Sequence, residues 1–165
     1  MADHVDSVLA QWAAQRPDLD VSPMAVIGRL KRVSRLIDTE LARTFAKHGL
    51  DAASFDVLAC LRRSDPPHRL TPTELMRTAM VTSGAVTQRL DRLEERGLLA
   101  RSRSETDGRG VLVSLTGEGR ALIDRALPDH VDTERRVLDA LDPAEQAALA
   151  DALRTLLESF GDRTG

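Results

Sequence analysis

Residues 70–116 decide the fold and read LTPTELMRTAMVTSGAVTQRLDRLEERGLLARSRSETDGRGVLVSLT. Thr71–Glu74 has the sequence of a capping box with Pro at the first helical position, and it predicts a short helix that ends near residue 79. Thr82 caps a second helix, which continues to Arg96 before a glycine that stops it. Leu98–Arg103 and Gly110–Leu115 then read as β-strands on either side of a polar tip.

This order of helix, turn, helix and hairpin is that of a winged helix-turn-helix, which inserts its second helix into the DNA major groove. In that helix, Val86, Leu90 and Leu93 form an inner apolar stripe at helical spacing. Polar side chains project elsewhere and suit base edges or phosphates, whereas arginines at the wing suit the minor groove. The predicted DNA-contacting residues are Thr71, Thr73, Ser83, Gly84, Thr87, Gln88, Arg92, Arg103 and Arg109. The alternative is a solvated helix face and ordinary surface arginines.

Helical patterns flank this segment on both sides. They predict helices over residues 3–15, 23–47, 52–63, 117–140 and 143–160. The predicted fold class is mainly α with a small β-hairpin wing, divided into a winged helix-turn-helix DNA-binding lobe and a helical dimerisation lobe. We assign residues 1–16 to an extra N-terminal helix, 22–50 and 117–161 to the dimerisation region, and 51–116 to the DNA-binding domain.

The composition favours a cytoplasmic helical protein and excludes several other classes. Only 2% of the residues are aromatic, so the core must be mostly aliphatic. No apolar run approaches the roughly 18 residues of a membrane span, and the N-terminus lacks a signal-peptide pattern. The single cysteine, Cys60, excludes an internal disulfide framework, and its apolar neighbours favour a core thiol over a redox sensor. Metal-ligand spacing and catalytic motifs are absent, so we expect no metal, no cofactor and no enzymatic activity.

The charge of the chain is unevenly distributed. The net charge is −3, which for a whole chain argues against nucleic-acid binding. Residues 61–110, however, carry ten Lys and Arg against seven Asp and Glu, so a module of net +3 lies in an acidic frame. Because +3 is modest, a winged helix used only for protein interaction remains the alternative of another class.

The long helices near both termini carry more apolar surface than a monomer of this size covers alone. We therefore expect a homodimer, with an ordinary helical core as the alternative. Two recognition helices about 34 Å apart would read the half-sites of a pseudo-palindromic operator in double-stranded DNA. His130, in the long helix after the wing, is either a solvated helix residue or one that meets its own copy on the two-fold axis.

Three stretches of the chain resemble the MarR family of bacterial winged-helix repressors: LTPTELMRTAMVTSGAVTQRLDRLEERGLL, DGRGVLVSLT and GEGRALI. The resemblance covers nearly the whole length. The wing keeps the Asp-x-Arg pattern of the family as Asp107 and Arg109, with Gly108 in place of the commoner arginine. The resemblance implies a transcriptional regulator, a repressor that releases its operator when a small molecule binds.

The region around Trp12, with the following RPDLDVSPMAVIGRL, resembles the PecS branch of the urate-responsive regulators in that family. Four ligand-linked positions of the branch match Trp12, Asp56, Arg89 and Arg101. The resemblance implies a small anionic ligand, with urate favoured. A tricarboxylate such as trans-aconitate or citrate is the alternative.

We hypothesise that this anion binds between the DNA-binding lobe and the dimerisation lobe. Trp12 supplies a flat wall and an indole N–H, Arg89 balances the charge, and Asp56 moves in response. Arg101 links the site to the wing. Arg89 borders the buried face of its helix, so taken singly it favours a structural salt bridge over a ligand contact.

Overall fold

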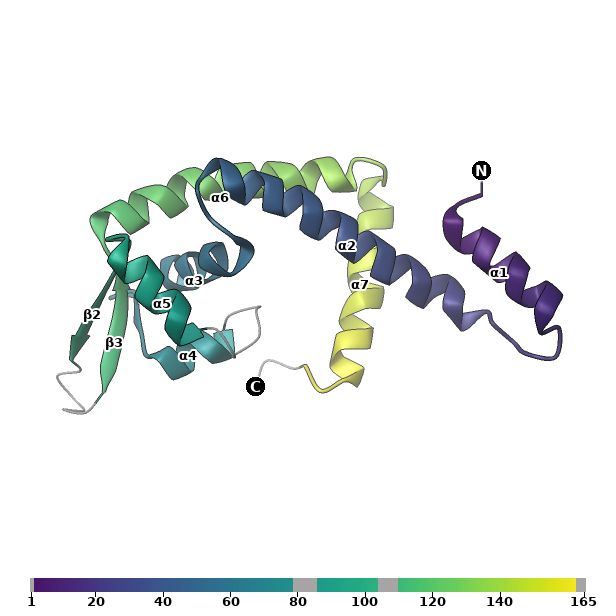
Figure 1. Ribbon diagram of the computed structural model, residues 1–165, viewed down its shortest axis with the longest axis horizontal. Helices are drawn as coiled ribbons and strands as arrows, with labels where there is room; N and C mark the ends of the chain where they lie inside the picture. The colour runs from purple at the N-terminus through teal and green to yellow at the C-terminus, as the bar shows by residue number, and fades with distance from the viewer. Residues whose placement is uncertain (1, 79–85, 104–109, 163–165) are drawn as a thin grey trace.

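The computed structural model describes residues 2–78, 86–103 and 110–162, and Figure 1 shows a mainly helical chain with a small sheet at one end. The helices are α1 (His4–Gln15), α2 (Pro23–Lys47), α3 (Ala52–Arg63), α4 (Pro72–Thr78), α5 (Val86–Glu95), α6 (Gly117–Leu138) and α7 (Pro143–Ser159). The strands are β1 (Arg69–Leu70), β2 (Leu99–Arg103) and β3 (Val111–Leu115). None of the helices in these ranges is long and apolar enough to cross a membrane.

The predicted fold class is confirmed, because the helices and the hairpin lie where the sequence places them. The structure adds one strand that the sequence did not predict. β1 pairs antiparallel with β3, with Arg69 opposite Ser114, so the sheet order is β1-β3-β2. A strand of two residues carries no alternating pattern, which explains why it was missed. The start of the second helix of the motif lies outside the described residues, and the division into domains stays a prediction.

The winged module is built around fully buried aliphatic side chains. Leu90 and Leu93 of α5 are buried, which confirms two members of the predicted inner stripe, and the side chain of Val86 is outside the described part. They belong to one core cluster with residues of α3, α4 and β3, namely Leu58, Leu61, Leu75 and Val113. Each such side chain contributes about 1.5–3 kcal/mol by leaving water. This burial fixes which face of α5 points outward.

A small aromatic cluster connects the module to the long helices. Phe45 of α2 stacks on Phe55 of α3 with ring centroids 4.4 Å apart, and His130 of α6 packs on both rings at 5.6 and 4.7 Å. His130 is therefore not the solvated helix residue of the simpler prediction. Its Nε2 lies 3.2 Å from Glu134, and its buried Nδ1 has no partner among the described residues.

The N-terminal helix packs along the first half of α2, at the end of the molecule opposite the wing (Figure 1). Asp3 caps α1, and Asp3 and Asp6 both accept hydrogen bonds from Arg29 of α2. Val5 is buried against Gly28, where an added Cβ would lie 3.3 Å from the valine. These contacts fix α1 to α2 through its first turn.

The junction between the recognition helix and α6 is unusually close. The backbone carbonyl of Leu98 accepts a hydrogen bond of 3.1 Å from the N–H of Thr116, which caps α6. In the first turn of α6, a Cβ added at Gly119 would lie 1.9 Å from that carbonyl oxygen. Only glycine therefore allows the first turn of α6 to contact this backbone.

We expect Gly119→Ala to destabilise the protein by at least about 1–3 kcal/mol, because the added methyl group overlaps rigid backbone. Gly117→Ala in the same turn is the matched control, since a Cβ there meets nothing within 4 Å. The control is expected to change stability by less than about 1 kcal/mol, in the stabilising direction. Urea denaturation measures both, and equal midpoints for the two variants would contradict the close approach.

Candidate DNA interface and ligand site

The recognition helix presents polar side chains opposite its buried leucines. Gln88 and Arg92 are exposed on α5, as a DNA-reading face requires. Thr87 lies in the first turn of α5. Ser83, Gly84 and Arg109 lie outside the described residues. The predicted contacts of this helix stay predictions, supported by the orientation that Leu90 and Leu93 impose.

At the start of α4, the two predicted threonines have different surroundings. The Thr71 hydroxyl donates to Glu74 Oε2 at 2.8 Å and accepts the Glu74 N–H at 3.2 Å, so the predicted capping box is present. The Thr71 N–H and the Thr71 hydroxyl both donate to the Glu74 carboxylate and hold the pKa of Glu74 below its ordinary value. Thr73 is exposed, and its hydroxyl has no intramolecular bond among the described residues. Thr73 is therefore the more available of the two for a phosphate.

Arg101 joins the wing to the recognition helix. Its guanidinium donates to Asp91 at 2.7 Å and to Glu94 at 2.6 Å, and its backbone N–H donates to Glu94 at 3.2 Å. The hydrogen bond to Asp91 is the largest cause of its raised pKa. Two carboxylates of α5 thus hold Arg101 of β2. Arg103, two residues further along the same strand, is exposed.

Arg89 forms an ion pair with Asp51, the residue that caps α3. The Arg89 side chain is only 19% exposed, so it borders the buried face of α5 as its position in the sequence predicts. Asp51 also accepts the Ser54 N–H at 2.7 Å. Burial raises the pKa of Asp51, but the Ser54 N–H and the Arg89 guanidinium outweigh it and hold the pKa below the ordinary value. An anion that binds Arg89 must therefore compete with Asp51.

Asp56 lies five residues further along the chain, in α3, and is a buried carboxylate at 8% exposure. The Cys60 Sγ lies 3.9 Å from Asp56 Oδ1 and 3.3 Å from the carbonyl oxygen of Thr78, so its single S–H has two acceptors within reach. Burial and the neighbouring Asp56 raise the pKa of the Cys60 thiol. A thiol with a raised pKa is a poor nucleophile, which supports the core role for Cys60 over redox sensing.

The four ligand-linked positions are not gathered within one chain. Asp56, Arg89 and Arg101 belong to the winged module, whereas Trp12 lies on α1 at the opposite end of the molecule (Figure 1). The Trp12 side chain is 41% exposed. A site that uses all four residues therefore needs α1 from a second chain.

Sequence reasoning missed the carboxylates that hold the two arginines. These carboxylates are Asp51, Asp91 and Glu94. Arg101 is seven and ten residues from its two partners, and Arg89 is 38 residues from Asp51. Pairs at these separations leave no local pattern in the sequence. Within the described ranges, no three potential metal-ligating side chains cluster.

Comparison of sequences places the chain among known regulators. The sequence pattern of the MarR family matches residues 48–110. The transcriptional regulator PecS of Dickeya dadantii is 45% identical over 145 residues, which cover 88% of this chain and 87% of that protein. The curated relatives are named as transcriptional regulators, which agrees with the prediction that the chain is not an enzyme.

Two solved structures share the fold. Sco3205, a MarR-family regulator from Streptomyces coelicolor solved in complex with DNA, has a TM-score of 0.78 and 29% identity, covering 86% of this chain and 93% of its own. Bordetella bronchiseptica BpsR, whose DNA binding is regulated by 6-hydroxynicotinic acid, has a TM-score of 0.71 and 30% identity, covering 79% and 91%. Fold, helix-turn-helix and sequence agree, and the chain therefore belongs to the MarR family of DNA-binding transcriptional regulators, in its PecS branch.

Proposed function

We propose that the chain acts as a cytoplasmic homodimeric repressor, which binds a pseudo-palindromic operator and releases it when urate binds. The observation that carries the proposal is the position of Arg89. It lies on the recognition helix, yet its charge is directed at Asp51 on α3 instead of at DNA. A residue placed in this way connects anion binding to the orientation of the reading helix.

The exposed apolar surface supports the homodimer. α7 buries no residue within the chain, and Phe160 at its end is 86% exposed. Large apolar side chains are also exposed along α2 and α7, namely Met24, Val26, Ile27, Val33, Leu36, Leu149, Leu156 and Leu157. Apolar surface on this scale marks an interaction site, and a second copy presents the same helices across a two-fold axis.

The DNA complex of Sco3205 supports the assignment of the operator-binding face. That protein has the same winged module, and in this chain Gln88, Arg92 and Arg103 stand exposed on α5 and β2. The Gln88 amide suits paired hydrogen bonds with adenine, whereas the two arginines suit hydrogen bonds to phosphates. These three side chains, with Thr73 at the start of α4, belong to the described part of the proposed interface.

The ligand acts through an exchange of partners at Arg89. A planar anion with two acceptor oxygens offers the guanidinium paired hydrogen bonds, and it replaces Asp51. The cap of α3 survives without Arg89, because Ser54 still donates to Asp51. α5 then loses the ion pair that connects it to the N-cap of α3. Only a ligand that binds this released state more tightly shifts the population away from the DNA-binding form.

Known relatives support a small anion as the effector. The DNA binding of BpsR is regulated by 6-hydroxynicotinic acid, which like urate is a compact, flat, acidic ring. In the proposed dimer, the Trp12 at each site comes from the partner subunit, because the α1 of the same chain lies too far away. A panel of urate, trans-aconitate and citrate in a thermal-shift assay separates the urate hypothesis from the tricarboxylate alternative.

We expect Arg103→Ala to weaken binding to the DNA upstream of the gene for this protein and to reduce the salt slope by about one, because one phosphate contact is lost. Arg154→Ala on α7 is the matched control, since Arg154 pairs with Asp151 far along the chain from the wing. Its affinity is expected to equal that of the wild type in a gel-shift titration. Binding that does not depend on salt would instead favour the protein-interaction alternative.

We expect Asp51→Asn to lower the urate concentration that releases DNA by about two- to fivefold, the size expected for a partly exposed ion pair. Asparagine caps a helix as well as aspartate does, so the variant removes the charge and keeps the cap.

We expect Arg89→Ala to abolish the release of DNA by urate. DNA affinity without urate is measured for each variant, because Arg89 lies in the reading helix. Release of DNA from Arg89→Ala at the wild-type urate concentration would exclude this site.

A mixed dimer tests whether the site is shared between subunits. One subunit carries Trp12→Ala and the other carries Arg89→Ala, and each variant homodimer is measured as a control. If Trp12 comes from the partner, one of the two sites in the mixed dimer is intact, so part of the urate response survives. If each site is built within one chain, both sites are damaged and the mixed dimer behaves like the homodimeric variants.

A further inference from the structure

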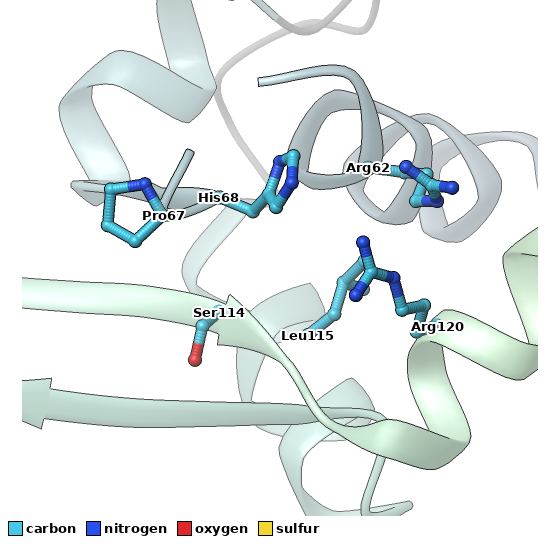
Figure 2. A pocket seen from close by; sticks show the side chains of 6 residues that line it. All are labelled: Arg62, Pro67, His68, Ser114, Leu115 and Arg120. Carbon is cyan, nitrogen blue, oxygen red and sulfur yellow. The ribbon is translucent and has the colours of Figure 1, made fainter. Parts of the chain in front are cut away.

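A small positively charged pocket lies on the winged module where α3, the segment before β1, the end of β3 and the start of α6 meet (Figure 2). Its volume is about 110 Å³. This is well below the roughly 300 Å³ at which pockets begin to accommodate drug-sized molecules. The lining residues are Arg62, Pro67, His68, Ser114, Leu115 and Arg120.

The charges that surround this pocket are not balanced. Arg62 donates through Nε to Asp124 at 2.6 Å, which leaves its two terminal nitrogens without a partner in the described part of the chain. The side chain of Arg120 forms no hydrogen bond or ion pair with any described residue. Figure 2 shows its guanidinium between His68 and Arg62. Of the two guanidinium groups, only that of Arg62 is paired with a carboxylate, and the remaining positive charge lies at the pocket.

The backbone around His68 sets the position and tautomer of its ring. His68 has a φ of 58°, a conformation that residues other than glycine adopt only where their surroundings enforce it. Its N–H donates to the carbonyl of Asp65 at 2.7 Å, and its Nδ1 lies 2.6 Å from the carbonyl of Ser64. Because a carbonyl only accepts, Nδ1 carries the hydrogen. In the neutral ring, Nε2 is then an acceptor.

The pocket is separate from both sites discussed above. It adjoins Ser114 and Leu115 at the end of β3, whereas the wing tip precedes the start of that strand. No residue of α5 lines it, and neither does any of Asp56, Arg89 and Arg101. A phosphate of an operator read by α5 and the wing tip is therefore not its natural occupant.

We propose that this pocket binds a free phosphate-sized oxyanion. Arg62 and Arg120 donate to its charged oxygens, and the Nε2 of His68 accepts the hydrogen of the remaining P–OH group. Arginine forks and phosphate oxygens form paired, charge-assisted hydrogen bonds. The bound anion joins α3 to the first turn of α6. It strengthens the connection between the DNA-binding module and the long helix, independently of urate.

Isothermal titration of the full-length protein with inorganic phosphate, at constant ionic strength, tests the proposal. The wild type is expected to bind saturably, and Arg120→Ala to bind about tenfold more weakly or worse, the loss expected for charged hydrogen bonds. Arg125→Ala is the matched control, because it removes an exposed arginine from the same helix without touching the pocket. Sulfate should bind more weakly than phosphate, because it has no hydrogen to donate to the Nε2 of His68.

Two results would overturn the proposal. The first is the absence of saturable phosphate binding by the wild type, and the second is an equal loss in Arg120→Ala and Arg125→Ala. If the wild type does not bind phosphate and Arg120→Ala also loses operator affinity, the pocket is instead a contact for the DNA backbone. Sulfate that binds as tightly as phosphate would remove His68 from the proposed site. These measurements contain no urate, so they test the phosphate pocket independently of the proposed effector.

Discussion

Arginine–carboxylate pairs hold the recognition helix at both ends. Near its start, Arg89 reaches back to Asp51 at the cap of α3, and near its end Asp91 and Glu94 hold Arg101 of β2. Buried leucines fix the rotation of the helix, but apolar packing alone tolerates sliding along its axis. Directed hydrogen bonds from guanidinium groups remove that freedom. The position of α5 relative to α3 and to the wing thus depends on contacts that another anion can replace.

The same contacts explain how an acidic chain presents a DNA-binding face. Arg89 and Arg101 are neutralised by carboxylates within the module, so they add little to its external field. The exposed arginines Arg77, Arg92 and Arg103 form no ion pair with a described residue, and they lie on α4, α5 and β2. In the proposed interface, the module therefore offers a few separate arginines to the phosphates instead of a broad basic surface.

The sequence predicted the elements of the fold because their signals are local. The capping box at Thr71 and the inner leucines of α5 each lie within a few residues, and both are present. β1 was missed because two residues carry no periodicity. The partners of Arg89 and Arg101 were missed because they depend on how elements pack, which one sequence does not encode locally. The distance of Trp12 from the module has the same origin, since the direction of α1 depends on tertiary contacts.

The contacts of α6 determine which motion can change the spacing of two recognition helices. Its first turn lies against the Leu98 carbonyl at Gly119, Asp124 pairs with Arg62, and His130 packs on the rings of Phe45 and Phe55. These contacts extend over most of the length of α6 and fasten it to the winged module and to α2. A hinge at the start of α6 would break the closest of them. In the proposed homodimer, we therefore expect α3 and this part of α6 to move together, with the pivot where the exposed apolar helices meet the second subunit.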